Sequence, residues 1–129
     1  MSFVTEIFDA LENSPGAIVL QEIHDGRITA HVTARTFLEY IARARAFLAA
    51  QGLKKGQRVA LLGHNGIRWA SMDLAIMAEG LIAVPLYARQ APAELVAIMK
   101  DCAPSLICCS DAELQNSIRQ VWQLSLIHI

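Results

Sequence analysis

Three short apolar segments, separated by stretches of helical periodicity, constrain the fold of this 129-residue chain most strongly. The segments are 59–63, 81–85 and 106–109, and none contains a charged residue. Strands without apolar–polar alternation are buried on both faces, as in parallel sheets whose connections are helices. The alternation of helix and strand from residue 36 onwards therefore predicts an α/β fold, with a parallel sheet of fully buried strands and right-handed crossovers.

The helices expected between these strands are indicated by their end signals. Thr36 and Glu39 form the pattern of a capping box, which predicts that a helix begins with Thr36 as its N-cap. Gly52 is the residue expected just beyond the end of that helix. Further helices are predicted at 67–79, at 93–101 after Pro92, and from Ser110 or Asp111 to about residue 122.

Residues 1–35 precede this pattern and are predicted to form a separate opening segment. A short amphipathic helix is expected at 2–12, followed by strands at 17–23 and 27–32. The sequence Asp25-Gly26 between the two strands is typical of a tight β-hairpin turn. We therefore predict an N-terminal helix and hairpin over 1–35, and a partial α/β subdomain over 36–123.

The last six residues, 124–129, do not continue the helical pattern before them. They can be written as the codons CTG TCT CTT ATA CAC ATC, which resemble a transposon end used as an adapter in sequencing libraries. We therefore predict that 124–129 are a non-native tail of translated adapter. A natural apolar tail or an additional strand is the alternative.

Charge and composition exclude several classes of function. Eleven Lys and Arg residues against twelve Asp and Glu give a net charge of −1, which disfavours a protein that coats nucleic acid or an anionic membrane. No stretch approaches the roughly 20 apolar residues of a transmembrane helix. The N-terminus lacks the basic start of a secretory signal, and the three cysteines have no C-x-x-C spacing. We therefore predict that the three cysteines are buried, reduced thiols and that the protein is cytoplasmic.

The sequence contains no local motif for catalysis or metal binding. A phosphate-binding P-loop, a G-x-G-x-x-G motif and a nucleophile elbow are all missing, and His and Cys lack metal-ligand spacing. We therefore assign no catalytic and no metal-ligating residue. His64 follows the first apolar strand, at the sheet edge where α/β proteins bind ligands, but a plain strand-to-helix turn is the favoured interpretation.

Short motifs between residues 36 and 111 occur in a specific order and spacing. They lie at 36–40, 52–62, 65, 68–69, 74–76, 78–80, 84–87 and 92–95. Together they resemble the N-terminal portion of the adenylate-forming (AMP-binding) enzymes, and Trp69 and Pro85-Leu86-Tyr87 resemble most the long-chain acyl-CoA synthetases. One departure is Gln57, where the family usually has Asp in a surface turn.

The resemblance implies the activity of a longer parent enzyme. Such an enzyme joins a carboxylate, expected here to be a fatty acid, to ATP with Mg²⁺, and then transfers the acyl group to coenzyme A. The family's phosphate loop and its other catalytic motifs lie downstream of the portion matched here. We therefore expect this chain to be inactive alone, as the N-terminal fragment of an acyl-CoA synthetase.

The resemblance also indicates one candidate binding segment. Tyr87 and Ala88 match positions that approach coenzyme A in short-chain relatives, and we add Arg89 as a nearby cation for a phosphate. The alternative is that Tyr87 packs against the core and Arg89 is solvated. Two other functions remain open: a stand-alone α/β binding or regulatory domain, and an adenylation enzyme that loads a carrier protein.

Overall fold

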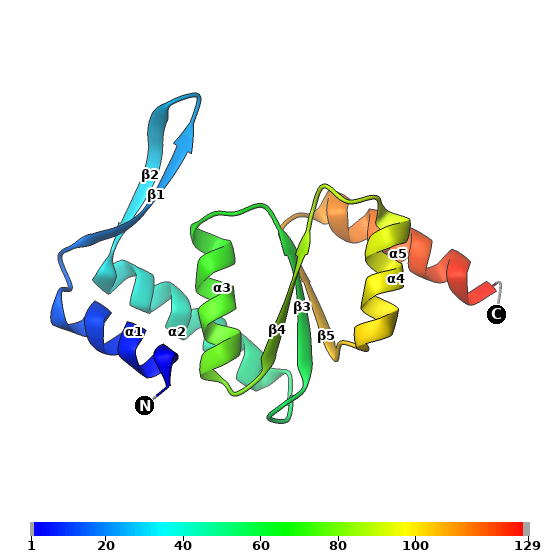
Figure 1. Cartoon of the computed structure of the whole chain (residues 1–129), viewed down its shortest axis with the longest axis horizontal. Coiled ribbons are helices and arrows are strands. Elements are labelled where there is room, and N and C mark those ends of the chain that lie inside the picture. The colour runs from blue at the N-terminus through cyan, green and yellow to red at the C-terminus, as the bar shows by residue number, and fades with distance from the viewer. Residues whose placement is uncertain (1, 128–129) are drawn as a thin grey trace. The chain divides into compact units, whose positions relative to one another are not determined.

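The computed structural model describes residues 2–127, with side chains as far as residue 123. It contains five helices and five strands in this part of the chain (Figure 1). The elements are α1 Phe3–Asn13, β1 Ile18–His24, β2 Arg27–Thr33, α2 Ala34–Ala50, β3 Arg58–Gly63, α3 Ile67–Ala78, β4 Ile82–Tyr87, α4 Pro92–Cys102, β5 Leu106–Cys109 and α5 Ala112–Ile127. The α/β fold class is confirmed.

The elements group into two compact units. The first comprises the residues up to Leu53 together with Asn65–Gly80, and so contains α1, the hairpin, α2 and α3. The second comprises Lys54–His64 together with the residues from Leu81 onwards, and so contains the three-stranded sheet, α4 and α5. Each unit therefore includes residues that are distant in sequence.

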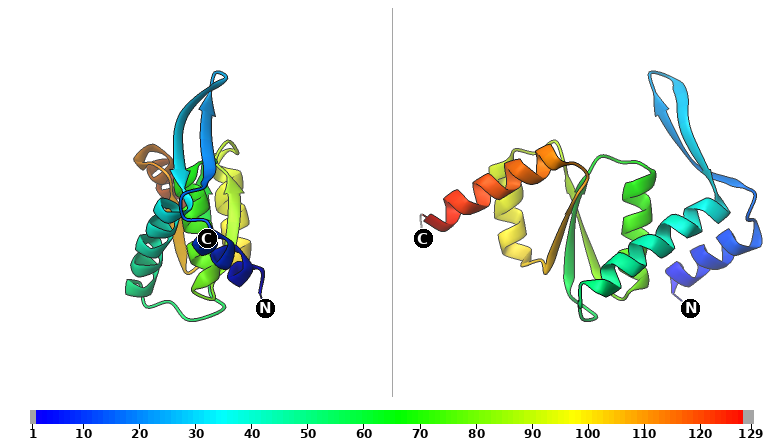
Figure 2. Two further views of the ribbon diagram at one scale, coloured as in Figure 1. Left: turned by 90° about the vertical axis from the view of Figure 1, so that its left-hand side faces the viewer. Right: turned by 180° about the vertical axis from the view of Figure 1, so that it is seen from behind.

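In the first unit, β1 and β2 form the predicted antiparallel hairpin. Asp25 and Gly26 at its tip both have positive φ angles, of 51° and 75°. Such angles are characteristic of the tight turn that Asp-Gly favours, because glycine adopts them without steric cost. Figure 2 shows α1 lying alongside α2, and the two helices are in contact.

The start of α2 differs from the prediction. The helix begins at Ala34, and its N-cap is Thr33, whose Oγ1 accepts a hydrogen bond from the Thr36 amide at 3.3 Å. The assignment of Thr36 as N-cap was therefore wrong. Thr33, the last residue of β2, supplies an equivalent hydroxyl three residues earlier. The Ala34 amide that follows it donates to the Ala17 carbonyl at 2.9 Å. The predicted glycine beyond the helix, Gly52, is confirmed with a φ of +69°.

The sheet of the second unit has the order β4-β3-β5, and both pairings are parallel. This confirms the predicted parallel sheet. The central strand β3 is buried from Val59 to Leu62. The core of the unit contains side chains from β3, α4 and α5: Ala60, Leu62, Leu95, Val96, Met99 and Ile118.

The two outer strands are less buried than the sequence predicted. Each pairs on one side only within the described residues. In β4, Ile82 is 47% exposed and Pro85 lies opposite Leu61 of β3. Proline has no N–H to donate, so an edge strand is where a sheet tolerates it. All four residues of β5 are only partly buried.

The last helix continues further than predicted. The backbone of α5 is helical to Ile127 rather than to about residue 122. Neither proline nor glycine follows Asp111, so no residue of that kind ends the helix. That 124–129 are translated adapter stays a prediction, as do the boundaries at 35 and 123, and residues 128 and 129 lie outside the described part of the chain.

Candidate functional site

The carboxyl edge of the three-stranded sheet is the candidate site. β3 ends at Gly63, β4 at Tyr87 and β5 at Cys109. In the register of the sheet, Gly63 lies opposite Tyr87, and Leu62 lies opposite Cys109. The three strand ends therefore meet along one edge. In open α/β sheets this edge is where ligands bind.

The predicted segment Tyr87-Ala88-Arg89 lies directly at this edge. Tyr87 is the last residue of β4, and a turn follows in which the Gln90 amide donates to the Tyr87 carbonyl at 3.1 Å. The Tyr87 side chain is 80% exposed, Ala88 is half-buried and Arg89 is exposed. The alternative from the sequence had two parts. Its first part, that Tyr87 packs against the core, is wrong. Its second part, that Arg89 is solvated, is confirmed. Contact with coenzyme A stays a prediction.

The end of β5 is fixed by the start of α5. The Ser110 amide donates to the Leu62 carbonyl at 2.9 Å. Asp111 Oδ1 then accepts the Leu114 amide at 2.7 Å, as a capping carboxylate does at a helix N-terminus. The predicted cap at Ser110 or Asp111 is confirmed for Asp111. Asp111 therefore places a negative charge at the start of α5.

His64 follows β3 at the same edge and is exposed. With Asn65 and Gly66 it connects β3 to α3, as the favoured interpretation predicted. The sequence did not predict how α3 begins. Gly66 provides no side-chain cap, and the Ile67 amide instead donates to Glu22 Oε1 of β1 at 3.0 Å. Since Glu22 precedes Ile67 by 45 residues, no local pattern signals this bond.

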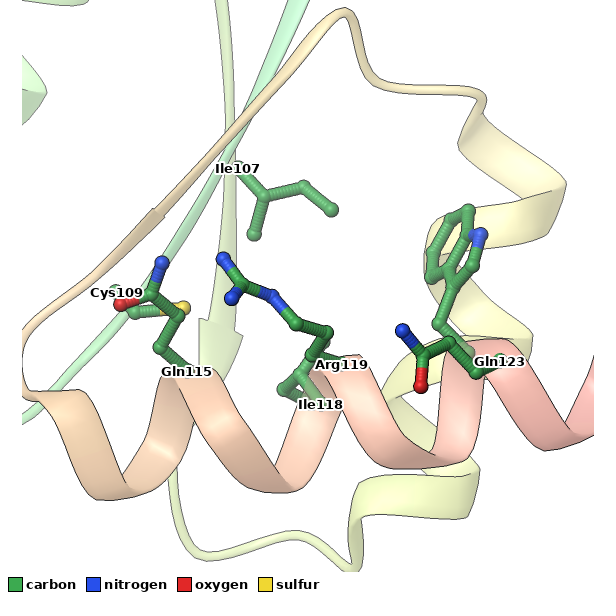
Figure 3. A pocket seen from close by; sticks show the side chains of 7 residues that line it. Ile107, Cys109, Gln115, Ile118, Arg119 and Gln123 are labelled. Carbon is green, nitrogen blue, oxygen red and sulfur yellow. The ribbon is translucent and has the colours of Figure 1, made fainter.

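A cavity of about 460 Å³ lies between β5 and α5 (Figure 3). Ile107 and Cys109 of the strand form one side, and Ile118 and Trp122 of the helix lie on the other. In the view of Figure 3, the Arg119 side chain extends from α5 toward the strand. The cavity is therefore largely apolar with one guanidinium.

The thiols near this cavity are poor nucleophiles. Burial, and secondly the neighbouring Cys109, raises the pKa of Cys108 to about 11. Burial also raises the pKa of Cys109, with the Asp111 carboxylate as the second cause. Because the thiolate is the reactive form, both cysteines are largely protonated and unreactive near neutral pH. All three cysteines are free, although they are half-buried rather than fully buried as predicted.

Two features are absent from residues 2–127, a metal-binding group and a membrane-spanning helix. No group of three or more His, Cys, Asp or Glu side chains in this range is arranged to hold a metal ion. None of the described helices is long and apolar enough to cross a membrane.

Comparison with known proteins identifies related sequences. The sequence profile of the family described as AMP-binding enzyme matches residues 7–127. The chain is 31% identical over 111 residues to the hybrid PKS-NRPS synthetase mycA of Thermothelomyces thermophilus, covering 86% of this chain and 3% of that protein. It is 26% identical over 95 residues to the long-chain-fatty-acid–CoA ligase FadD15 of Mycobacterium bovis, covering 74% of this chain and 16% of the ligase.

The fold is also similar to that of a solved structure. The inhibitor-bound N-terminal domain of FACL13 from Mycobacterium tuberculosis superposes with a TM-score of 0.77 at 24% identity. The match covers 90% of this chain and 29% of that one. The chain thus spans less than a third of each of these relatives.

Proposed function

Because this chain belongs to the AMP-binding enzyme family, we propose that it is the N-terminal part of an ATP-dependent acyl-CoA synthetase. The family match over residues 7–127 carries the proposal, since it includes every strand of the parallel sheet. The similarity to a long-chain-fatty-acid–CoA ligase supports a fatty acid as the carboxylate. A cytoplasmic location is supported by the three free cysteines, which are typical of reducing compartments.

The proposed reaction of the whole enzyme has two steps. A carboxylate oxygen attacks the α-phosphorus of ATP, and pyrophosphate leaves. The thiol sulfur of coenzyme A, after losing its proton, attacks the acyl carbon, and AMP leaves as the thioester forms. The first step is needed because a carboxylate lacks a good leaving group. Magnesium would screen the phosphates, but residues 2–127 hold no cluster of acidic or imidazole side chains suited to it. We assign no step with ATP or Mg²⁺ to this chain.

The residues described here fit a role in holding coenzyme A. The exposed Tyr87 ring presents an aromatic surface at the carboxyl edge of the sheet. Ala88 is small enough for close approach of a ligand, and the Arg89 guanidinium is suited to phosphate oxygens. When bound, coenzyme A supplies the thiol that accepts the acyl group. In this proposal Tyr87, Ala88 and Arg89 bind and orient it.

The role of this turn is tested by Arg89→Ala in the full-length enzyme. We expect the KM for coenzyme A to rise about tenfold with little change in the KM for ATP, because one charge-assisted contact to a phosphate is lost. Arg27→Ala, at an exposed position on the hairpin, is the matched control. An unchanged KM for coenzyme A in Arg89→Ala would contradict the assignment.

The proposed dependence on the rest of the enzyme is tested with the 129-residue chain itself. We expect no carboxylate-dependent exchange between ATP and pyrophosphate, because the family's phosphate loop and its other catalytic motifs lie downstream of the portion matched here. The full-length enzyme, assayed in parallel, is expected to catalyse the exchange. Exchange by the isolated chain would refute the proposal.

A second candidate function differs in the acyl acceptor. The 31% identity to a hybrid PKS-NRPS synthetase favours an enzyme that loads a carrier protein instead of coenzyme A. The two candidates are separated by supplying the full-length enzyme with ATP, a fatty acid and either acceptor. Acyl transfer to coenzyme A supports the synthetase, and transfer only to a phosphopantetheinylated carrier supports the alternative.

A further inference from the structure

A second cavity, of about 650 Å³, lies within the first unit. Its walls come from β1, β2, α2 and α3, and it contains none of the residues assigned to coenzyme A. Two features distinguish it, an excess of positive charge and an apolar wall. The residues on which the argument depends are Glu22, Val32, Tyr40, Arg43, Arg68 and Met72.

The positive charge gathers at the start of α3. The first amides of a helix carry a partial positive charge, so acidic residues normally occupy its first turn. Here the first turn contains no acidic residue, and its second position is Arg68. The Glu22 carboxylate offsets part of this charge by accepting the Ile67 amide at 3.0 Å. The start of α3 therefore brings a guanidinium and a helix N-terminus together against one carboxylate.

A second guanidinium is added from α2. Arg43 lies 5.9 Å from the centroid of the Tyr40 ring, a cation–π arrangement that helps hold it at the wall of the cavity. Neither Arg43 nor Arg68 forms an ion pair with a described carboxylate, whereas Arg45 on the same helix pairs with Glu79 at 2.9 Å. Both guanidinium groups that line the cavity thus remain available to an anion.

The remaining lining is mostly apolar. Val32 and Ile67 are 5% and 8% exposed, and Met72 and Ala44 complete this wall. Ser71 also lines the cavity, but its hydroxyl already donates to the Ile67 carbonyl at 2.7 Å. The surface open to an apolar group therefore comes mainly from Met72 and Ala44, which are half-buried, and Val32 and Ile67 lie behind it.

We propose that this cavity binds an amphipathic anion. Its oxyanion contacts Arg43 and Arg68, and its apolar body lies against Ala44 and Met72. A fatty carboxylate and the phosphate ester of an alkyl chain share this chemistry. The inference goes beyond acyl-CoA synthesis and does not depend on it, because the site and its test belong to this chain alone.

Four small probes test the proposal on the 129-residue chain by isothermal titration calorimetry. Octanoate and octyl phosphate carry both the charge and the chain, octanol carries only the chain, and inorganic phosphate carries only the charge. We expect at least one of the charged alkyl probes to bind ten times or more tighter than octanol and than phosphate. The tighter of the two identifies a carboxylate or a phosphate ester as the natural head group.

Substitution locates the binding. In the double variant Arg43→Gln/Arg68→Gln we expect at least a tenfold loss of affinity for the tighter probe. Arg27→Gln, on the hairpin but outside the cavity, is the control and should bind like the wild type. Thermal unfolding of the variants confirms that the fold is retained.

Three results would overturn the proposal. Octanol binding as tightly as the charged alkyl probes would show that the arginines play no part, and phosphate binding as tightly would show that the apolar wall plays none. Retention of full affinity by the double variant would place the binding elsewhere on the chain. Absence of binding by both charged alkyl probes would also refute it.

Discussion

The hairpin and the strand β3 are both rich in β-branched and aliphatic residues, but they differ sharply in burial. On the hairpin, Ile18, Ile23 and Ile28 are 55%, 60% and 57% exposed. In β3, none of the residues from Val59 to Leu62 exceeds 5% exposure. An apolar sequence therefore favours a strand, but the neighbours of that strand decide how much surface it buries.

Pairing explains the difference. β3 has a strand on each side, and its Ala60 and Leu62 pack in a core with side chains of α4 and α5. Each hairpin strand pairs only with the other, within the described residues. Buried apolar surface stabilises a fold by about 25 cal/mol per Å². Shortening an apolar side chain should therefore lower the free energy of unfolding much more in β3 than in the hairpin.

The largest effect is expected for Leu62→Ala in β3. Removing a fully buried leucine side chain leaves a cavity and should lower the free energy of unfolding by about 3 kcal/mol. Ile23→Ala on the hairpin is the matched control and should cost under about 1 kcal/mol, because this side chain is mostly solvated. Urea denaturation at 25 °C measures both. Equal losses would show that the two strands do not differ in this way.

The next effect concerns the junction between the hairpin and α2. Thr33→Ala removes the hydroxyl that accepts the Thr36 amide and should cost about 1 kcal/mol. Thr36→Ala should cost less, because its hydroxyl bonds only the Thr33 hydroxyl. The comparison uses the same denaturation assay. A larger loss for Thr36→Ala would restore Thr36 as the cap predicted from the sequence.

A smaller effect is expected from pH in the sheet unit. Burial raises the pKa of Cys108 from 9.0 to about 11, which favours the neutral thiol in the folded state. The stability from this group is therefore complete below about pH 9 and is lost as the pH rises toward 11. Because the thiol is partly exposed, we expect a loss of roughly 0.5 to 1 kcal/mol.

The control for this effect is Cys108→Ala. Unfolding free energies of both proteins are measured at pH 8 and pH 10.5, and the wild type should lose more stability than the variant between these values. Parallel losses would mean that ionisation of Cys108 does not contribute.

The smallest change in stability is expected for Ile28→Thr on the hairpin. Threonine is also a good strand former, so the free energy of unfolding should change by less than about 0.5 kcal/mol. Self-association at high concentration should decrease, because exposed apolar side chains promote it. Sedimentation velocity measures the association. A loss above 1 kcal/mol would indicate that Ile28 is more buried than the structure shows.

Much of the fold could be predicted because its signals are local. The apolar segment 106–109 corresponds to β5, and Asp25-Gly26 forms the expected turn. The N-cap was missed because two threonines three residues apart offer the same hydroxyl. The segment predicted for β4 ended at Pro85, although the strand continues to Tyr87, which lies opposite Gly63. That extension depends on a pairing partner that no sequence window contains.

The functional sites also differ in whether a local sequence signal predicts them. The family pattern indicated Tyr87 and Ala88, and Arg89 was added as a nearby cation. The structure places all three in one turn at the carboxyl edge of the sheet. The cavity containing Arg43 and Arg68 had no signal in the sequence, because its residues come from four separate elements. Such a site becomes recognisable only when the hairpin, α2 and α3 are folded together.

The bond between Glu22 and the Ile67 amide also affects the order of folding. It joins residues 45 positions apart. Closing a loop of this length lowers the conformational entropy of the chain, and this cost opposes formation of the contact early in folding. The hairpin turn closes over only a few residues and can form early. We therefore expect the Glu22 contact to form after the main folding barrier, where a contact slows unfolding more than it speeds folding. The start of α3 is thus stabilised by the Glu22 carboxylate, whose bond to the Ile67 amide we expect to form late in folding.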